Sequence, residues 1–221
     1  MTADQATRLI VAVAQLVGVL IWPALILFVI VRFRSGLTDF FGHIGEVSVK
    51  ALGAEISAKH QEAAAAIGAA VGARELAGAS LGVAADPREV ADALPSVRAQ
   101  RRMEGSRVLW VDDRPDNNRY ERQALEALGL RIDLSTSTDD ALEKVRGRNY
   151  DLIISDMGRP PDDRAGYTLL KKLRDAGHST PFIIYAGSRD PKHVQEARQR
   201  GALGATNRPQ ELLEMVTRAL A

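Results

Sequence analysis

Three aspartates at the ends of two apolar runs are the residues whose type and spacing could do chemistry. Asp112 and Asp113 end a run that begins at Arg107, and Asp156 ends a run that begins at Tyr150. If both runs are strands of one parallel sheet, their carboxyl ends meet at the edge where such sheets bind ligands. Three carboxylates there repel one another unless a cation or a proton intervenes. Mg²⁺ prefers oxygen ligands, so the trio predicts a Mg²⁺ pocket; a solvated acidic rim without metal is the alternative.

The elements that must position these aspartates are predicted from about residue 105 onward, where apolar runs alternate with amphipathic stretches. Five strand–helix units in succession predict an α/β fold with a doubly wound, five-stranded parallel sheet. The expected strands are residues 107–112, 131–134, 150–156, 182–185 and 203–206. The expected helices are residues 115–128, 138–146, 166–176, 191–200 and 209–219.

This part of the chain resembles the receiver domain of two-component response regulators. The likeness is carried, in the expected order, by residues 108–113, 153–157, 181–185, 201–204 and 208–209. It covers about residues 106–221, roughly half of the chain, and implies the flavodoxin-like receiver fold.

The resemblance also implies roles for the acidic residues. Asp156 matches the aspartate that accepts a phosphoryl group, and Asp112 and Asp113 match the acidic pair that holds Mg²⁺. The backbone carbonyl of Gly158 is expected as a further ligand, with Asp113 binding directly and Asp112 through water. A carboxylate can attack phosphorus only if the charge between the two is neutralised, which the metal does.

Three positions depart from the family pattern. Ala186 stands where the family usually has Thr or Ser, Ala205 replaces a common aromatic, and Arg208 replaces a Lys. Ser188 could supply a hydroxyl two residues late. The usual switch that reports phosphorylation is therefore not expected in its ordinary form.

Arg208 carries two further expectations. We expect it to form a salt bridge with Asp156, which would mimic a charge-neutralised state and favour a locked pseudo-receiver. We also expect the peptide bond before Pro209 to be cis, because bonds preceding proline tolerate that isomer.

The N-terminal part, residues 1–34, is predicted to be a membrane anchor. Residues 9–31 contain no charge, and a helix of that length can cross a hydrocarbon core of about 30 Å. Arg32 and Arg34 follow the span, so the positive-inside rule places the C-terminal domain in the cytoplasm. The predicted location is the inner (cytoplasmic) membrane, crossed once.

Residues 35–104 are expected to form a juxtamembrane amphipathic segment and an Ala/Gly-rich helical linker that precede the receiver-like domain, residues 105–221. Residues 62–85 predict a poorly packed helix or a self-associating stalk, because each Gly costs a helix about 1 kcal/mol. Residues 47–56 alternate weakly as a small hairpin. Pro87 favours the start of a helix.

Composition excludes several classes of function. The net charge is +1, from 29 basic and 28 acidic residues, so no general field attracts nucleic acid. The chain has no Cys, which excludes a thiol nucleophile and a Cys-ligated zinc site.

These features predict a membrane-tethered signalling module that accepts a phosphoryl group on Asp156 or acts as a pseudo-receiver. Its expected partners are the membrane, a histidine kinase or a downstream effector, and a second copy of the chain. Since the sequence ends with the last expected receiver helix, output is expected through protein contacts or the membrane segment. One alternative is a phosphorylation-independent, self-assembling membrane effector in stress or defence, and another is a Mg²⁺-dependent phosphohydrolase.

Overall fold

The computed structural model describes residues 54–74, 87–186 and 191–221. Residues 56–221 form one compact unit. The anchor predicted at residues 9–31, the juxtamembrane segment and Ser188 lie outside the described residues. Within the described ranges, no helix is both long and apolar enough to cross a membrane.

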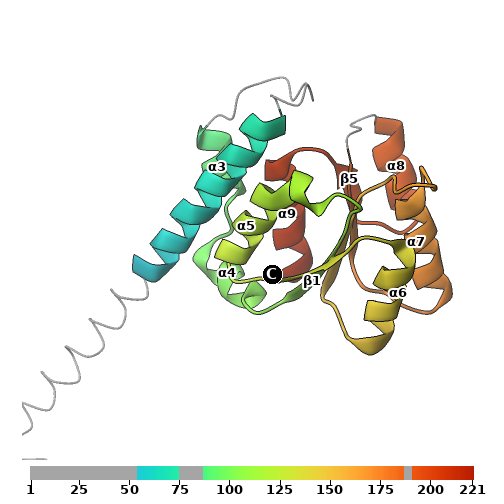
Figure 1. Cartoon of the computed structure of the whole chain (residues 1–221). Coiled ribbons are helices and arrows are strands. Elements are labelled where there is room, and N and C mark those ends of the chain that lie inside the picture. The colour runs from blue at the N-terminus through green and yellow to red at the C-terminus, as the bar shows by residue number, and fades with distance from the viewer. Residues whose placement is uncertain (1–53, 75–86, 187–190) are drawn as a thin grey trace, which may run out of the picture. The chain divides into compact units, whose positions relative to one another are not determined.

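A five-stranded parallel sheet forms the centre of the unit (Figure 1), which confirms the predicted α/β architecture. Its strand order is β2-β1-β3-β4-β5. The strands are β1 (Arg107–Val111), β2 (Arg131–Ser135), β3 (Leu152–Ser155), β4 (Phe182–Tyr185) and β5 (Gly204–Thr206). Val111 of β1 lies opposite Ser135 of β2 and Ser155 of β3, so β1 and β3 end at the same level.

Helices cover both faces of the sheet, with α5 and α9 on one side and α6, α7 and α8 on the other (Figure 1). Their bounds are η1 (Pro115–Asn118), α5 (Arg119–Ala127), α6 (Thr138–Gly147), α7 (Ala165–Asp175), α8 (Pro191–Gln199) and α9 (Pro209–Leu220). The segment expected as one helix at 115–128 is a 3-10 turn followed by α5.

Alternate side chains of each strand feed two separate cores. Val108 and Trp110 of β1 pack on the α5 and α9 side, whereas Leu109 and Val111 pack on the opposite side. All four side chains are at most 1% exposed. A strand that is buried on both faces needs a continuous apolar run, which is the pattern that identified β1 in the sequence.

Two short helices, α3 (Pro87–Ala93) and α4 (Val97–Met103), pack against α9. α3 begins at Pro87, as expected. Ser96 caps α4 by accepting a hydrogen bond from the backbone N–H of Ala99 at 3.3 Å. Met103 is fully buried and joins the core between α5 and α9.

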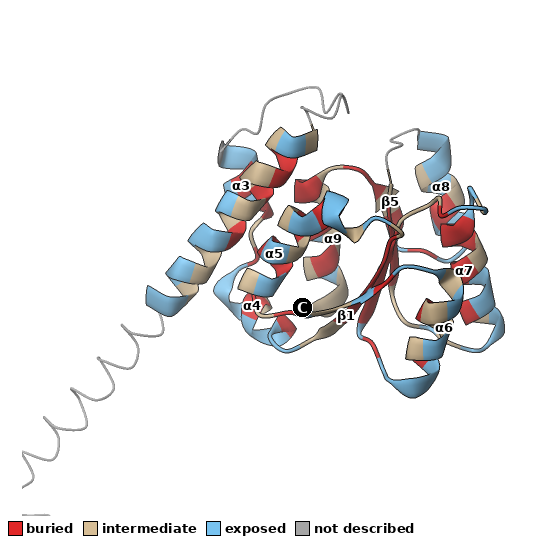
Figure 2. Ribbon diagram, in the orientation of Figure 1, coloured by how far each residue is buried: buried red, intermediate tan, exposed pale blue. Residues whose placement is uncertain are grey.

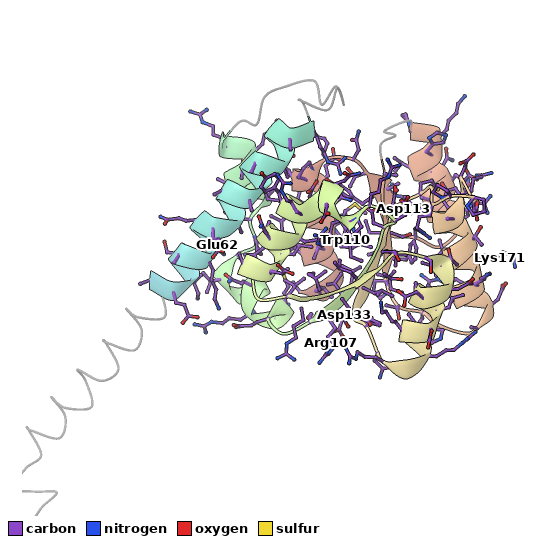
Figure 3. All side chains as sticks on the ribbon, in the orientation of Figure 1. Glu62, Arg107, Trp110, Asp113, Asp133 and Lys171 are labelled. Carbon is purple, nitrogen blue, oxygen red and sulfur yellow. The ribbon has the colours of Figure 1, made fainter. Side chains whose placement is uncertain are left out.

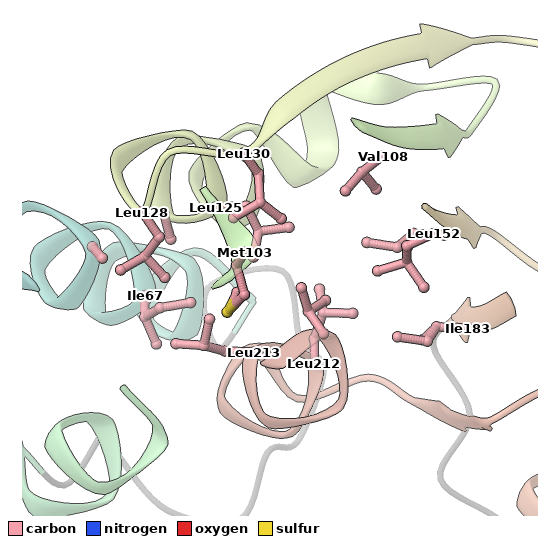
Figure 4. Packing of buried hydrophobic residues seen from close by; sticks show 14 of the residues in the cluster. Ile67, Met103, Val108, Leu125, Leu128, Leu130, Leu152, Ile183, Leu212 and Leu213 are labelled. Carbon is pink, nitrogen blue, oxygen red and sulfur yellow. The ribbon is translucent and has the colours of Figure 1, made fainter. Parts of the chain in front are cut away.

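Residues 54–74 form a helix whose apolar face packs on the same core (Figure 2). Ala63 and Ile67 are 0% and 1% exposed, and Figure 4 shows Ile67 beside Met103, Leu128 and Leu213. The expectation of a poorly packed helix is therefore wrong for residues 62–74, where Ala70 and Val71 are also at most 2% exposed. The hairpin expected at 47–56 is wrong at residues 54–56, which are helical.

Replacing Ile67 by Ala should lower the free energy of unfolding by about 2–5 kcal/mol, the range for truncating a buried aliphatic side chain. Denaturant unfolding of the full chain in detergent measures this change. Glu62→Ala is the matched control on the exposed face of the helix, and its effect should stay within about 0.5 kcal/mol. Equal effects of the two variants would contradict the packing described.

Candidate functional site

The ends of β1 and β3 bring Asp112, Asp113 and Asp156 together. One carboxylate oxygen from each lies within 4.8 Å of the other two. Backbone hydrogen bonds fix this arrangement, since the Asp156 N–H donates to the carbonyl of Val111 at 2.9 Å. Figure 3 labels Asp113, just beyond the end of the strand that carries Trp110.

The two aspartates after β1 differ in how firmly the protein holds them. Asp112 is 4% exposed, and its Oδ1 accepts a hydrogen bond from the backbone N–H of Arg114 at 2.7 Å. Its Oδ2 accepts one from the side-chain amide of Asn118. Asp113 is more exposed and faces the Arg114 guanidinium at 3.7 Å. Asp112 is thus oriented in advance, whereas Asp113 is open to a ligand.

Asp156 has a raised pKa. Burial of the carboxyl is the largest cause, and the negative charges of Asp112 and Asp113 add to it. A hydrogen bond from the backbone N–H of Met157, at 2.7 Å, and the positive charge of Arg159 oppose the rise. A bound cation would relieve the same repulsion that favours the proton.

Arg159 is a residue of this site that the sequence reasoning missed. It is 4% exposed, and one guanidinium nitrogen donates to Ser155 Oγ and to the carbonyl of Asp156, both at 2.8 Å. The other terminal nitrogen donates to Thr138 Oγ1 at 3.2 Å. Burial lowers its pKa while the acidic residues raise it, with a net decrease. Its charge partly offsets the acidic cluster, and a basic residue three positions after Asp156 was the available signal.

The expected salt bridge between Arg208 and Asp156 is wrong in this structure. Arg208 instead contacts Glu89 of α3 at 2.7 Å and Glu211 of α9 at 3.4 Å. Two carboxylates already occupy its guanidinium, which explains the difference. Its role as the substitute for the family Lys stays a prediction.

The cis peptide expected before Pro209 is also wrong. Among the described residues, the cis bond joins Pro160 and Pro161, in the loop that follows Asp156.

This loop packs tightly against the start of α7 through Gly166. The Gly166 N–H donates to the carbonyl of Met157 at 2.8 Å. A Cβ added to Gly166 would lie 2.8 Å from the carbonyl oxygen of Asp156, too close for any real side chain. The absence of a side chain at this position lets the helix pack closely on the loop that follows Asp156.

Two cavities flank Asp156. One, of about 450 Å³, is lined by Asp112, Asp156, Ala186 and Arg74 among others. The second, of about 700 Å³, has Ala186 and Ala205 in its wall, together with Gly158. The two alanines offer only methyl groups to the cavity that Asp156 lines, where the family pattern has a hydroxyl and an aromatic ring.

The acidic cluster fits a divalent cation. Three carboxylates from two strands supply the oxygen donors that such a cation prefers. Burial is the main cause of the raised pKa of Asp156, and repulsion by Asp112 and Asp113, which a cation would offset, adds to it. Asp112, Asp113 and Asp156 could hold the ion. The carbonyl of Gly158, two residues after Asp156, is the further ligand that the family resemblance implies.

In chelator-treated protein, Asp156→Asn should raise the free energy of unfolding at neutral pH. Stability contributed by a group with a raised folded-state pKa is present below its unfolded value, near 3.8, and is lost as pH rises through the folded value. The asparagine does not titrate, so the gain should vanish below that pH. Denaturant titrations across pH measure it, with the exposed Asp139→Asn as control. A gain that does not change with pH would contradict this origin.

The family model of the response regulator receiver domain matches residues 108–219, half of the chain. The sensor protein EvgS of Escherichia coli K12 is 37% identical over 75 residues, which cover 34% of this chain and 6% of EvgS. The transcriptional regulatory protein DltR of Streptococcus agalactiae is 30% identical over 112 residues, covering 51% of this chain and 49% of DltR. The chain therefore spans less than half the length of these curated relatives.

Solved structures that match this chain include a response regulator. The response regulator TrrA of Thermotoga maritima, solved in complex with Mg(2+)-BeF, is 24% identical with a TM-score of 0.45. That match covers 52% of this chain and 99% of TrrA. On the strength of the family match across β1 to α9, this chain belongs to the response regulator receiver domain family.

Proposed function

We propose that the chain is a membrane-tethered signalling protein whose receiver domain accepts a phosphoryl group on Asp156 in the presence of Mg²⁺. The observation that carries the proposal is the meeting of three carboxylate oxygens within 4.8 Å at the ends of β1 and β3. Family membership supports a place in two-component signalling. The partner of this reaction is a histidine kinase or a small phosphodonor.

The transfer uses one carboxylate oxygen of Asp156 as the nucleophile. That oxygen forms a bond to phosphorus while the bond between phosphorus and the donor breaks, and the leaving group departs with the electron pair. Bound Mg²⁺ would neutralise the charge between carboxylate and phosphoryl oxygens. The backbone N–H of Met157, at 2.7 Å from Asp156 Oδ1, holds the nucleophile in place.

The response to phosphorylation differs from the usual switch of the family. The methyl side chain of Ala186 cannot donate a hydrogen bond to a phosphoryl group, and Ala205 carries no ring that could change position. Arg208 is engaged by Glu89 and Glu211. Output then passes through protein contacts, including contacts with a second copy of the chain.

The same observations support a second candidate, a pseudo-receiver whose assembly at the membrane needs no phosphorylation. The ion pair of Arg208 with Glu89 favours it, because this cation is directed to α3 and α9. In this candidate, self-association of the tethered chain is the signal, and the acidic cluster has a structural role.

Full-length protein in detergent, treated with Mg²⁺ and a small phosphodonor, should gain the mass of one phosphoryl group. Asp156→Asn should abolish the gain, because it removes the nucleophile, and a chelator should reduce it strongly. Asp163→Asn, an exposed carboxylate in the same loop, is the matched control and should keep the adduct. A wild-type chain without an Asp156-dependent adduct would favour the pseudo-receiver.

Membrane attachment has its own test. The uncharged run at residues 9–31 should carry the full chain into the membrane fraction and resist extraction by high salt and alkali. A chain lacking residues 1–34 should remain in the soluble fraction. Recovery of the full chain in the soluble fraction would refute the tether.

A further inference from the structure

The helix of residues 54–74 delivers a charged side chain to the acidic site from outside the part of the chain that matches the family. Arg74, the last described residue of this helix, lines the 450 Å³ cavity together with Asp112 and Asp156. Its side chain is 18% exposed. An arginine at this depth is held by specific partners, and those partners connect it to the metal-binding residues.

Asn118 forms the connection. Its Oδ1 accepts a hydrogen bond from an Arg74 guanidinium nitrogen at 2.7 Å, and its Nδ2 donates to Asp112 Oδ2. Asn118 is 6% exposed. A guanidinium can only donate and a carboxylate can only accept, so the amide has one orientation that satisfies both. Arg74 therefore helps to hold the Asn118 amide in the orientation that presents its Nδ2 to Asp112.

The other partners of Arg74 hold it in this position. Its Nε donates to Glu121 Oε1 at 3.0 Å, and its guanidinium carbon lies 4.4 Å from the centre of the Tyr185 ring. Glu121 is 2% exposed and also accepts a hydrogen bond from the Tyr185 hydroxyl at 2.7 Å. Tyr185 in turn precedes Ala186, which lines the same cavity as Asp156. The guanidinium is thus fixed between α5 and the end of β4.

We propose that Arg74 is a positioning residue of the acidic site, and that cation binding at the site is coupled to docking of the helix of residues 54–74. The identity of the cation, Mg²⁺, rests on the proposed function. With Asn118 held by Arg74, Asp112 is oriented before the cation arrives. Without Arg74 the Asn118 Oδ1 loses its donor, so the amide is held only by Asp112 and the cation must order it.

Coupling of this kind is reciprocal. If docking of the helix strengthens cation binding by a given factor, the cation strengthens docking by the same factor. Occupancy of the acidic site is then transmitted to the chain that precedes the receiver domain. In the proposed function, that preceding chain leads to the membrane.

The test compares Arg74→Met with Lys59→Met in full-length protein in detergent. Both variants remove a cation from the same helix, but Lys59 pairs with the exposed Glu104, away from the acidic site. Isothermal titration with Mg²⁺ should show about a tenfold loss of affinity for Arg74→Met, as for other residues that support a metal ligand. Lys59→Met should bind Mg²⁺ as the unaltered chain does.

Hydrogen exchange supplies a readout that a purely structural role would not move. In the unaltered chain and in Lys59→Met, Mg²⁺ should slow amide exchange in residues 54–74. In Arg74→Met, exchange there should be faster and independent of Mg²⁺. Since Arg74→Met leaves Glu121 buried without its cation, the double variant Arg74→Met/Glu121→Gln provides a folded alternative that still disconnects Asn118.

The possible results distinguish the coupling from the proposed function. Equal Mg²⁺ affinity in the unaltered chain and in the double variant would overturn the coupling and leave the proposed function intact. Loss of the Asp156 phosphoryl adduct with retained, Arg74-dependent Mg²⁺ binding would overturn phosphorylation and leave the coupling intact. Failure of the unaltered chain to bind Mg²⁺ would overturn the coupling together with the metal in the proposed function.

Discussion

Repulsion among three carboxylates held at the ends of two adjacent strands is the constraint on which the site depends. Asp112, Asp113 and Asp156 cannot move apart, because parallel hydrogen bonding between β1 and β3 fixes the backbone that carries them. The protein responds by giving both oxygens of Asp112 a donor and by burying Arg159 nearby. A proton on Asp156 or a bound cation would complete the balance of charge, because either one reduces the repulsion.

Much of the fold follows from the sequence because buried parallel strands and amphipathic helices leave different periodic patterns. The apolar run before Asp112 identified β1, and the run before Asp156 identified β3. Since strand ends meet at one edge of a parallel sheet, the meeting of the three aspartates could be deduced without coordinates. The division of residues 115–128 into a 3-10 turn and a helix was harder to predict, because the two have similar residue spacing over one turn.

The charged partners could not be deduced, because they depend on segments far apart in the sequence. Arg208 was expected to pair with Asp156 because it replaces the family Lys, yet it pairs with Glu89, which is 119 residues away in the sequence. Arg159 was overlooked because a surface loop is the ordinary place for an arginine, and its burial depends on how the loop closes over Ser155. Residues 62–85 were expected to form a poorly packed helix or a self-associating stalk, since their many small residues give no information about the receiver surface on which residues 62–74 pack.

The largely buried ion pair of Arg74 and Glu121 attaches this helix to α5. Breaking a buried ion pair by removing one partner typically costs about 3–5 kcal/mol, although apolar residues of similar shape often stabilise a fold equally well. The net stability gained from the pair is therefore a weak reason for its presence. What an apolar pair could not do is present a donor to Asn118 and so orient Asp112. An arginine at residue 74 therefore links the preceding chain to the acidic site through Asn118.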